Sequence, residues 1–269
     1  RALTDPYSYF TDNGIIGIKG IDTRALTRHI RSHGSMFGVI STLSGNIASL
    51  LKKIHENESR PVNLVEEVST DAKYHIRGRG FHVCLLDFGS KSNIIRSLQT
   101  RDCSITVMPH DSTANDILDM KPDGILLSNG PGDPRDLVNV IPEIKKLAHS
   151  GIPVLGICLG HQLLALSLGM DIYKLKFGHH GGNHPVRDLI TGKCHITSQN
   201  HNYAVSLENM APGIVATHVN VNDGTSEGIM HTSLPVSSVQ YHPEAAPGPE
   251  DSAYIFDGFI ETMRKNKNA

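Results

Sequence analysis

Neither sign of charge predominates in this chain of 269 residues, in which 25 lysines and arginines stand against 27 aspartates and glutamates. There is therefore no basic excess to attract nucleic acid or an anionic membrane surface. Long hydrophobic runs are also missing, since no apolar stretch reaches the roughly 18 residues needed to cross a bilayer. We expect a small molecule as the substrate, and neither nucleic acid nor membrane as a partner.

Cysteine is scarce, and no Cys-x-x-Cys pair occurs; the four residues are Cys84, Cys103, Cys158 and Cys194. Scattered cysteines are expected where thiols stay reduced, which predicts a cytoplasmic location. No signal or transit segment is recognisable, and the chain opens on Arg1 rather than on methionine. We therefore expect a fragment that lacks its natural beginning.

The first 75 residues show one clear helical signal and little strand pattern. Asp22 is a suitable N-cap, TRALTRHIRSH follows it, and Gly34 ends the helix. A second helical run covers residues 46–59, and the polar stretch 68–80 is typical of a linker. We place the boundary near Gly80. Residues 1–75 then form part of a smaller N-terminal domain with a small core, and residues 81–269 form the second domain.

Short apolar runs alternate with helical patterns after residue 80. FHVCLLDF, CSITVM, DGILLS and IPVLGI are separated by helical patterns near 92–101, 113–120 and 140–150. Strands that are apolar on both faces and alternate with helices predict an α/β fold with a central, mostly parallel sheet. Beyond residue 170 we expect short strands and a final helix near 253–265. Such sheets bind ligands at the carboxyl ends of their strands.

One cysteine stands at a predicted strand end. Cys158 follows the apolar run 152–157, and LGHQLLALSLG after it has the pattern of a buried helix. Gly156 and Gly160 give the Gly-x-nucleophile-x-Gly spacing of a nucleophile elbow, where small neighbours allow a sharp turn. The helix N-terminus favours a thiolate there. The alternative is a cysteine that only packs at the strand end, and the glycine spacing by itself does not decide between the two.

Two further strand ends carry residues that would complete a catalytic arrangement. His242 and Glu244 stand two apart in QYHPEAAPGP, so an extended chain lets the carboxylate orient the imidazole. In LLSNGPGDP, Gly130 and Gly132 can bring backbone N–H groups to an oxyanion. Each segment alone reads more simply as a surface turn. Together with Cys158 we expect them to converge at one edge of the sheet, which unrelated turns would seldom do.

These segments together resemble a known family. GICLGHQ, SNGPGDP, TSQNHNYAV and HPEAAPGP are similar to the class I, or triad, glutamine amidotransferases over about residues 81–266. More specifically, GIDTRALTRHIRSHGS, DFGSKSNIIRSL, KFGHHGGNHPVRD and PGPEDSAYIFDGFI resemble the small, glutamine-hydrolysing chains of carbamoyl-phosphate synthetases. The resemblance implies a flavodoxin-like amidotransferase domain preceded by part of a smaller one.

The resemblance also implies a role for each matching residue. Cys158 would be the nucleophile, His242 the acid/base and Glu244 its orienting carboxylate, with backbone N–H groups of Leu159 and Gly132 at the oxyanion. L-Glutamine would be bound by Gly130, Gly132, Leu159, Gln162, Asn200, Asn202 and Tyr203.

Two departures from the family pattern bear on glutamine binding. Asn202 stands where the family often has glycine, and we expect asparagine's tolerance of a left-handed backbone to preserve a main-chain contact. A serine contact of the family lies in a part of its N-terminal domain that precedes this chain, so we expect a lower affinity for glutamine.

The sequence contains no Gly-x-x-x-x-Gly-Lys-Ser/Thr phosphate loop, so we expect no nucleotide cofactor on this chain. The resemblance implies that ATP and Mg²⁺ are used on a separate large subunit. There, ammonia from this chain would react with carboxyphosphate on the way to carbamoyl phosphate, which feeds arginine and pyrimidine synthesis. Since water would protonate free ammonia, we expect a sealed passage between the two chains.

Two other functions remain as alternatives. An amidotransferase of another pathway, such as guanine-nucleotide or anthranilate synthesis, is disfavoured by the matching segments outside the triad. A non-catalytic assembly or regulatory domain is disfavoured because Cys158, His242 and Glu244 are all present.

A histidine-rich segment, FGHHGGNHP, raises the question of a metal site. It contains His179, His180 and His184, with His195 and His201 nearby. No His-x-x-x-His helix or Cys/His framework accompanies them, so we predict no metal and a structural loop beside the cleft.

Overall fold

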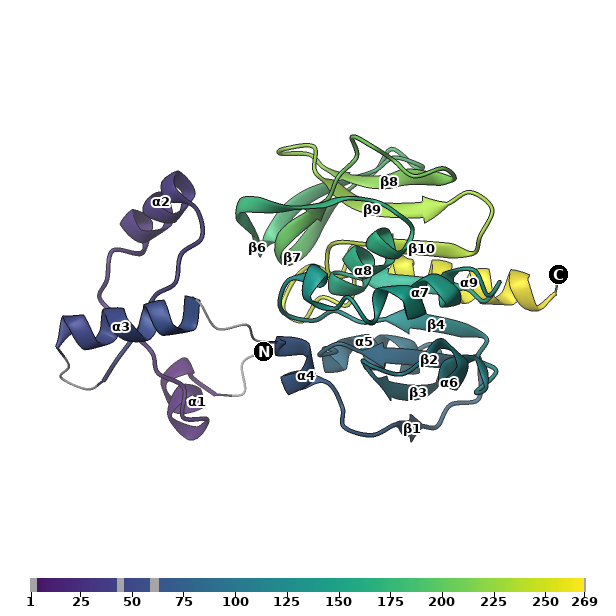
Figure 1. Cartoon of the computed structure of the whole chain (residues 1–269), viewed down its shortest axis with the longest axis horizontal. Helices are drawn as coiled ribbons and strands as arrows, with labels where there is room; N and C mark the ends of the chain where they lie inside the picture. Colours follow the sequence, from purple (N-terminus) through teal and green to yellow (C-terminus); the bar gives the residue numbers. More distant parts are fainter. Residues whose placement is uncertain (1–3, 43–45, 59–62, 269) are drawn as a thin grey trace. The chain divides into compact units, whose positions relative to one another are not determined.

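The computed structural model describes residues 4–42, 46–58 and 63–268. The chain divides into two compact units, Arg1–Val62 and Asn63–Ala269 (Figure 1). This division comes earlier than the boundary expected near Gly80, because α4 (Leu64–Val68) and β1 (Tyr74–Ile76) belong to the second unit. Val65 packs in its core and β1 pairs with a strand of its sheet. The segment expected as a linker is therefore part of the larger unit.

The first unit contains three described helices: α1 (Pro6–Asp12), α2 (Thr23–His33) and α3 (Ile47–Glu58). Helix α2 has the predicted ends, since Asp22 Oδ1 accepts a hydrogen bond from the Ala25 N–H at 2.8 Å and Gly34 follows with a φ of 96°. Among the described residues of this unit only Gly34 is buried. The small core expected here is therefore not found in those residues.

The second unit is built on a ten-stranded sheet within the described residues, with helices on both faces (Figure 1). After β1 the strands are β2 (His82–Asp87), β3 (Ser104–Pro109), β4 (Gly124–Leu127), β5 (Val154–Ile157), β6 (Ile172–Asp188), β7 (Cys194–Val205), β8 (Ile214–Asn220), β9 (Ser226–His231) and β10 (Val236–Val239). After α4 the helices are α5 (Ser92–Gln99), α6 (Ala114–Leu118), α7 (Ile141–Ala148), α8 (Leu159–Ser167) and α9 (Tyr254–Lys267), with a 3-10 turn η1 (Pro134–Asp136).

The sheet has a parallel part and an antiparallel part that meet at β10. The strand order is β1-β3-β2-β4-β5-β10-β9-β8-β6-β7. The pairings from β3 to β10 are parallel, whereas those from β10 to β7 are antiparallel. The predicted parallel strands are thus confirmed. Because β4, β5 and β10 are parallel neighbours, the segments that follow them emerge side by side at one edge.

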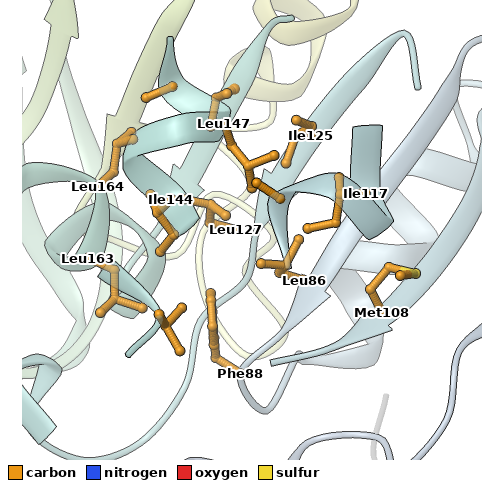
Figure 2. Packing of buried hydrophobic residues seen from close by; sticks show 14 of the residues in the cluster. Leu86, Phe88, Met108, Ile117, Ile125, Leu127, Ile144, Leu147, Leu163 and Leu164 are labelled. Carbon is orange, nitrogen blue, oxygen red and sulfur yellow. The ribbon is translucent and has the colours of Figure 1, made fainter. Parts of the chain in front are cut away.

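Two apolar layers cover the parallel strands, one on each face. Along β2, Cys84 and Leu86 belong to one layer and Val83 and Leu85 to the other, as the two-residue repeat of a strand requires. Figure 2 shows the first layer, where side chains of α6, α7 and α8 meet those of the strands. Helices α5 and α9 supply the second. In the described ranges no helix is both long and apolar enough to span a membrane.

The prediction of a loop at the histidine-rich segment was wrong. That segment lies within β6, a strand of 17 residues that pairs with β7. Irregular pairing between Lys174 and His179, and again between Gly181 and His184, lets the glycines and histidines remain in the ladder. Strand β9 was also not anticipated.

Candidate active site

Cys158 occupies a sharp turn between β5 and α8. It has a φ of 54° and a ψ of −102° at the N-cap of the helix, a strained conformation for a residue with a side chain. Its side chain is buried, and its Sγ lies 3.9 Å from the carbonyl oxygen of Asn200. The strand-to-helix turn expected from the sequence is present, with the backbone strain typical of nucleophile elbows.

The two flanking glycines are required by close packing rather than by their own dihedral angles. A Cβ at Gly156 would lie 2.7 Å from the carbonyl oxygen of Gly160, and a Cβ at Gly160 would lie 2.2 Å from that of Leu127. The Gly160 N–H also donates to the Ser128 carbonyl at 3.0 Å. The start of α8 is thereby held directly against the end of β4.

His242 and Glu244 follow β10, the strand next to β5. The Nδ1 of His242 lies 2.7 Å from Oε1 of Glu244, a distance typical of a charge-assisted hydrogen bond. Both side chains are buried. The His242 N–H donates to the Ser198 carbonyl at 2.9 Å, which joins this segment to β7. The expected contact between imidazole and carboxylate is therefore formed.

The electrostatics of this pair favour the charged forms. Burial lowers the pKa of His242, but the charge and hydrogen bond of Cys158, together with those of Glu244, raise it to about 9. Burial raises the pKa of Glu244, whereas the hydrogen bond and charge of His242, with the charge of Lys91, hold it below its ordinary value. The end of β10 therefore holds a cationic histidine hydrogen-bonded to a carboxylate.

Two residues that sequence reasoning missed contact Glu244. Lys91 Nζ lies 3.2 Å from Oε1 of Glu244, and Asn93 Nδ2 donates to the Glu244 backbone carbonyl. Both follow β2, whose carboxyl end lies at the same edge of the sheet. Their signal in the sequence is the polar run SKSN, which begins shortly after the apolar strand β2 ends. In the sequence this run contributed only to the family resemblance.

The glycine loop after β4 lies beside the elbow. A Cβ at Gly130 would lie 2.2 Å from the Phe88 carbonyl oxygen and 2.6 Å from Cδ2 of Leu159, so the loop packs on the first residue of α8. Gly132 has a φ of 92° and open space where a Cβ would be. Asn129 anchors the loop, because its Oδ1 accepts from the Lys91 N–H at 2.9 Å. Gly130 thus packs on Leu159, the residue that follows Cys158, whereas the part of these residues in binding glutamine stays a prediction.

The other residues expected to bind glutamine come from α8 and β7. Gln162 Nε2 donates to the Tyr203 carbonyl and to Gln240 Oε1, each at 3.0 Å, so this amide connects the helix to both strand segments. Asn200 contacts Cys158 through its carbonyl, and its Oδ1 lies 2.9 Å from His180 Nδ1. Asn202 lies inside β7, so its backbone is extended, and the expected left-handed conformation is not needed there.

A cluster of possible metal ligands lies beside these strands. His179, His201 and Glu227 each place one ligand atom within 4.8 Å of the others, and all three are buried. The two histidines belong to the group considered from the sequence as metal ligands. Glu227 was not considered; it lies on β9, 26 residues after His201.

The sequence matches two family models. Residues 84–262 match the class-I glutamine amidotransferase model, and residues 2–40 match the CPSase domain of the carbamoyl-phosphate synthase small chain.

Curated relatives are similar over nearly the whole chain. The carbamoyl phosphate synthase small chain of Clostridium perfringens is 50% identical over 256 residues, which cover 94% of this chain and 71% of that relative. The pyrimidine-specific small chain of Bacillus subtilis is 48% identical over 255 residues, covering 95% of this chain and 69% of that relative.

Solved structures share the fold of the larger unit. A Thermoplasma acidophilum protein assigned as part of a GMP synthase superposes with a TM-score of 0.62 at 22% identity, covering 71% of this chain and 97% of that one. A glutamine amidotransferase from Thermotoga maritima gives a TM-score of 0.50 at 15% identity, covering 71% and 85%. The central sheet with its covering helices is thus an amidotransferase fold.

Proposed function

This chain belongs to the class-I glutamine amidotransferases and, among them, to the carbamoyl phosphate synthase small chains, and on that premise we propose that it hydrolyses L-glutamine to glutamate and ammonia. The observation that carries the proposal is the hydrogen bond of 2.7 Å between His242 and Glu244 beside the strained Cys158. These residues follow β5 and β10, which are parallel neighbours in the sheet.

The first half of the reaction forms a thioester. The Cys158 thiolate attacks the side-chain amide carbon of glutamine, and the oxyanion accepts hydrogen bonds from the backbone N–H groups of Leu159 and Gly132. The imidazolium of His242 donates its proton to the departing nitrogen, the C–N bond breaks, and ammonia leaves. Glu244 stabilises the imidazolium through the hydrogen bond to Nδ1, and Lys91 balances the charge of that carboxylate.

The second half releases glutamate and restores the site. His242, now neutral, accepts a proton from water while the hydroxide oxygen attacks the thioester carbon. The C–S bond breaks, so glutamate leaves with the oxygen from water, and Cys158 returns as a thiolate beside an imidazolium. One water molecule is consumed and no redox partner is required.

Glutamine would be bound by backbone and neutral amide groups. Gly130 and Gly132 supply the loop, Leu159 the start of α8, and Gln162, Asn200, Asn202 and Tyr203 the opposite side. Neutral donors and acceptors suit a substrate whose reacting amide is uncharged. Gln162 acts by holding β7, because its amide is occupied by the Tyr203 carbonyl.

The ammonia would pass to a large synthetase chain. We expect that chain to use ATP and Mg²⁺ to convert bicarbonate to carboxyphosphate and to combine it with the ammonia, giving carbamate and then carbamoyl phosphate. We place the reaction in the cytoplasm, where thiols stay reduced, and all four cysteines here are free.

The test is selective labelling of Cys158. The chain, alone and mixed with the large chain, is treated at neutral pH with a glutamine-analogue electrophile, with and without excess glutamine. Adducts are mapped by mass spectrometry while glutamate release is assayed. We expect one adduct, on Cys158, that glutamine prevents. Burial raises the pKa of Cys84 to about 12 and that of Cys103 to about 11, so both should be unreactive.

The exposed Cys194 provides the matched control. The C158S variant should lose both the protected adduct and glutamate release, whereas C194S should keep both. Equal labelling of Cys158 and Cys194, with no protection by glutamine and no glutamate formed, would reject the hydrolase and favour a non-catalytic domain.

A further inference from the structure

A cluster of two buried side chains, His179 and Glu227, and one half-exposed carboxylate, Asp223, lies on β6, on β9 and in the turn between β8 and β9. His179, on β6, has its Nε2 2.8 Å from Oδ2 of Asp223 and its Nδ1 3.4 Å from Oε1 of Glu227. Both imidazole nitrogens therefore face carboxylates. The Nε2 contact with Asp223 is a hydrogen bond, whereas Nδ1 has no hydrogen-bond partner among the described residues and only approaches Glu227.

Glu227 is buried beside His179. Its side chain is fully buried, Oε1 accepts one hydrogen bond from Asn220 Nδ2 at 3.0 Å, and Oε2 has no hydrogen-bond partner among the described residues. A buried carboxylate is costly unless it is paired with a cation.

This cluster contacts the strand that carries the proposed glutamine contacts. His179 pairs with His201 across the β6–β7 ladder, and their rings pack edge to face at 4.9 Å. The Nδ1 of His201 lies 2.8 Å from the Tyr203 carbonyl oxygen. The next residue on β6, His180, contacts the side chain of Asn200, whose carbonyl oxygen lies beside Cys158.

The ladder alone fixes this part of β7 poorly. Register shifts on both sides of residues 179–181 leave a short, isolated run of pairing opposite residues 199–201. Where pairing is interrupted, strand position depends on side-chain contacts. The cluster connects three segments at this run, namely β6, the turn between β8 and β9, and β9 itself. These side-chain contacts fix the strand where the interrupted ladder does not.

We propose that the cluster of His179, Asp223 and Glu227 is a positioning element, which fixes residues 199–203 of β7 for glutamine binding through the packing of His179 on His201. The proposal rests on the proposed function. None of the three residues needs to touch glutamine, so their removal should weaken binding more than it slows the chemical steps.

A competing occupant is a metal ion, since His179, His201 and Glu227 could each supply one ligand. A metal ion between these three side chains would replace the direct contact of His179 with Glu227. The two arrangements are therefore exclusive, and a metal assay separates them.

The experiment measures glutamate release by the chain mixed with its large chain. Glu227→Gln keeps the shape and removes the charge, while Glu227→Asp keeps the charge. Because residues 199–203 are proposed to bind glutamine rather than to react with it, we expect E227Q to raise KM for glutamine at least about tenfold, with kcat within about twofold. E227D should recover part of the loss. D223N, at a half-exposed carboxylate, should act in the same direction and is less disruptive to folding.

His218→Gln is the control for buried polar substitution. His218 is also buried, but its ring nitrogens face the side-chain oxygens of Thr217 and Tyr254 rather than any atom of β7. H218Q should change thermal stability without changing KM. An unchanged KM in folded E227Q and D223N, an equal loss of kcat and kcat/KM, or one zinc per chain by elemental analysis would each overturn this cluster as a positioning element.

A second readout keeps the two proposals separate. Absence of glutamate release by the wild-type mixture would reject the proposed function. Crystal structures of wild type and E227Q would then decide on the cluster: displaced residues 199–203 support it, and an unmoved strand rejects it.

Discussion

Substituting Gly160 by alanine should separate the nucleophile from its partners without touching a catalytic group. The new Cβ would lie 2.2 Å from the Leu127 carbonyl oxygen, whereas real Cβ contacts essentially never fall below 3.0 Å. The start of α8 must therefore move away from β4 by at least 0.8 Å, the difference between these two distances. Cys158 is the N-cap of that helix and has to move with it.

The size of the effect follows from the displacement and the strain. Misplacing a reacting group by about 1 Å can reduce the rate by up to roughly 100-fold. Overpacking a close contact costs about 1–3 kcal/mol of folding free energy. In a domain of this size each kcal/mol lowers Tm by roughly 2–4 °C, so we expect a Tm lower by roughly 2–12 °C.

The assay compares G160A with Gly258→Ala. Gly258 is exposed in α9, and a Cβ there meets nothing within 4 Å, so alanine should add about 0.5–1 kcal/mol of stability through helix propensity. We expect G160A to remain folded, with kcat for glutamate release and the rate of Cys158 labelling both reduced by roughly 10- to 100-fold. Wild-type rates and Tm in G160A would refute the reasoning, because the contact would then not constrain the elbow.

Two other outcomes follow from the same structure. The pKa of His242 is raised to about 9, so its imidazolium should persist through neutral pH and be lost as pH rises through 9. We therefore expect kcat/KM to fall as the pH rises through 9. A fall that begins near pH 6.5, the ordinary pKa of histidine, would contradict this assignment. Leu126 is fully buried in the layer under α5 and α9, so Leu126→Ala should lower the free energy of unfolding by about 2–5 kcal/mol. Thermal melting should show a lower Tm, while kcat is retained at temperatures below the transition. An unchanged Tm would argue against this packing.

The catalytic part of the site could be predicted because its reactive residues follow short apolar runs that are recognisable as strands. Cys158 and His242 each follow a short apolar run, and Glu244 is close to His242 in sequence. Neighbouring parallel strands then bring these residues together. Lys91 and Asn93 could not be assigned in the same way, because their partner Glu244 lies more than 150 residues away and only the strand order makes them neighbours.

The antiparallel half of the sheet was harder to predict from the sequence, for a physical reason. Strand β6 contains Gly178, Gly181 and Gly182 among polar residues, and its pairing is interrupted twice, so it shows neither a two-residue alternation nor an apolar run. Glu227 was missed because a buried carboxylate leaves no signal unless its countercharge is known. The expectation for residues 1–75 was also incomplete, since Val65 and the strand at 74–76 pack on the larger unit.

The isolated bridge between Ser198 and His242 joins β7 to the segment after β10, and these two strands stand at opposite ends of the antiparallel half of the sheet. The β6–β7 ribbon must therefore fold back over the edge where the parallel strands end. Its fully buried members of the apolar clusters are Val186 and Val205, fewer than in the two layers around β2, β4 and β5, and regions with little buried apolar contact open at lower free energy than the core. Under mild heat or denaturant, detachment of this ribbon would abolish turnover while the parallel layer remains folded, so inactivation should precede melting.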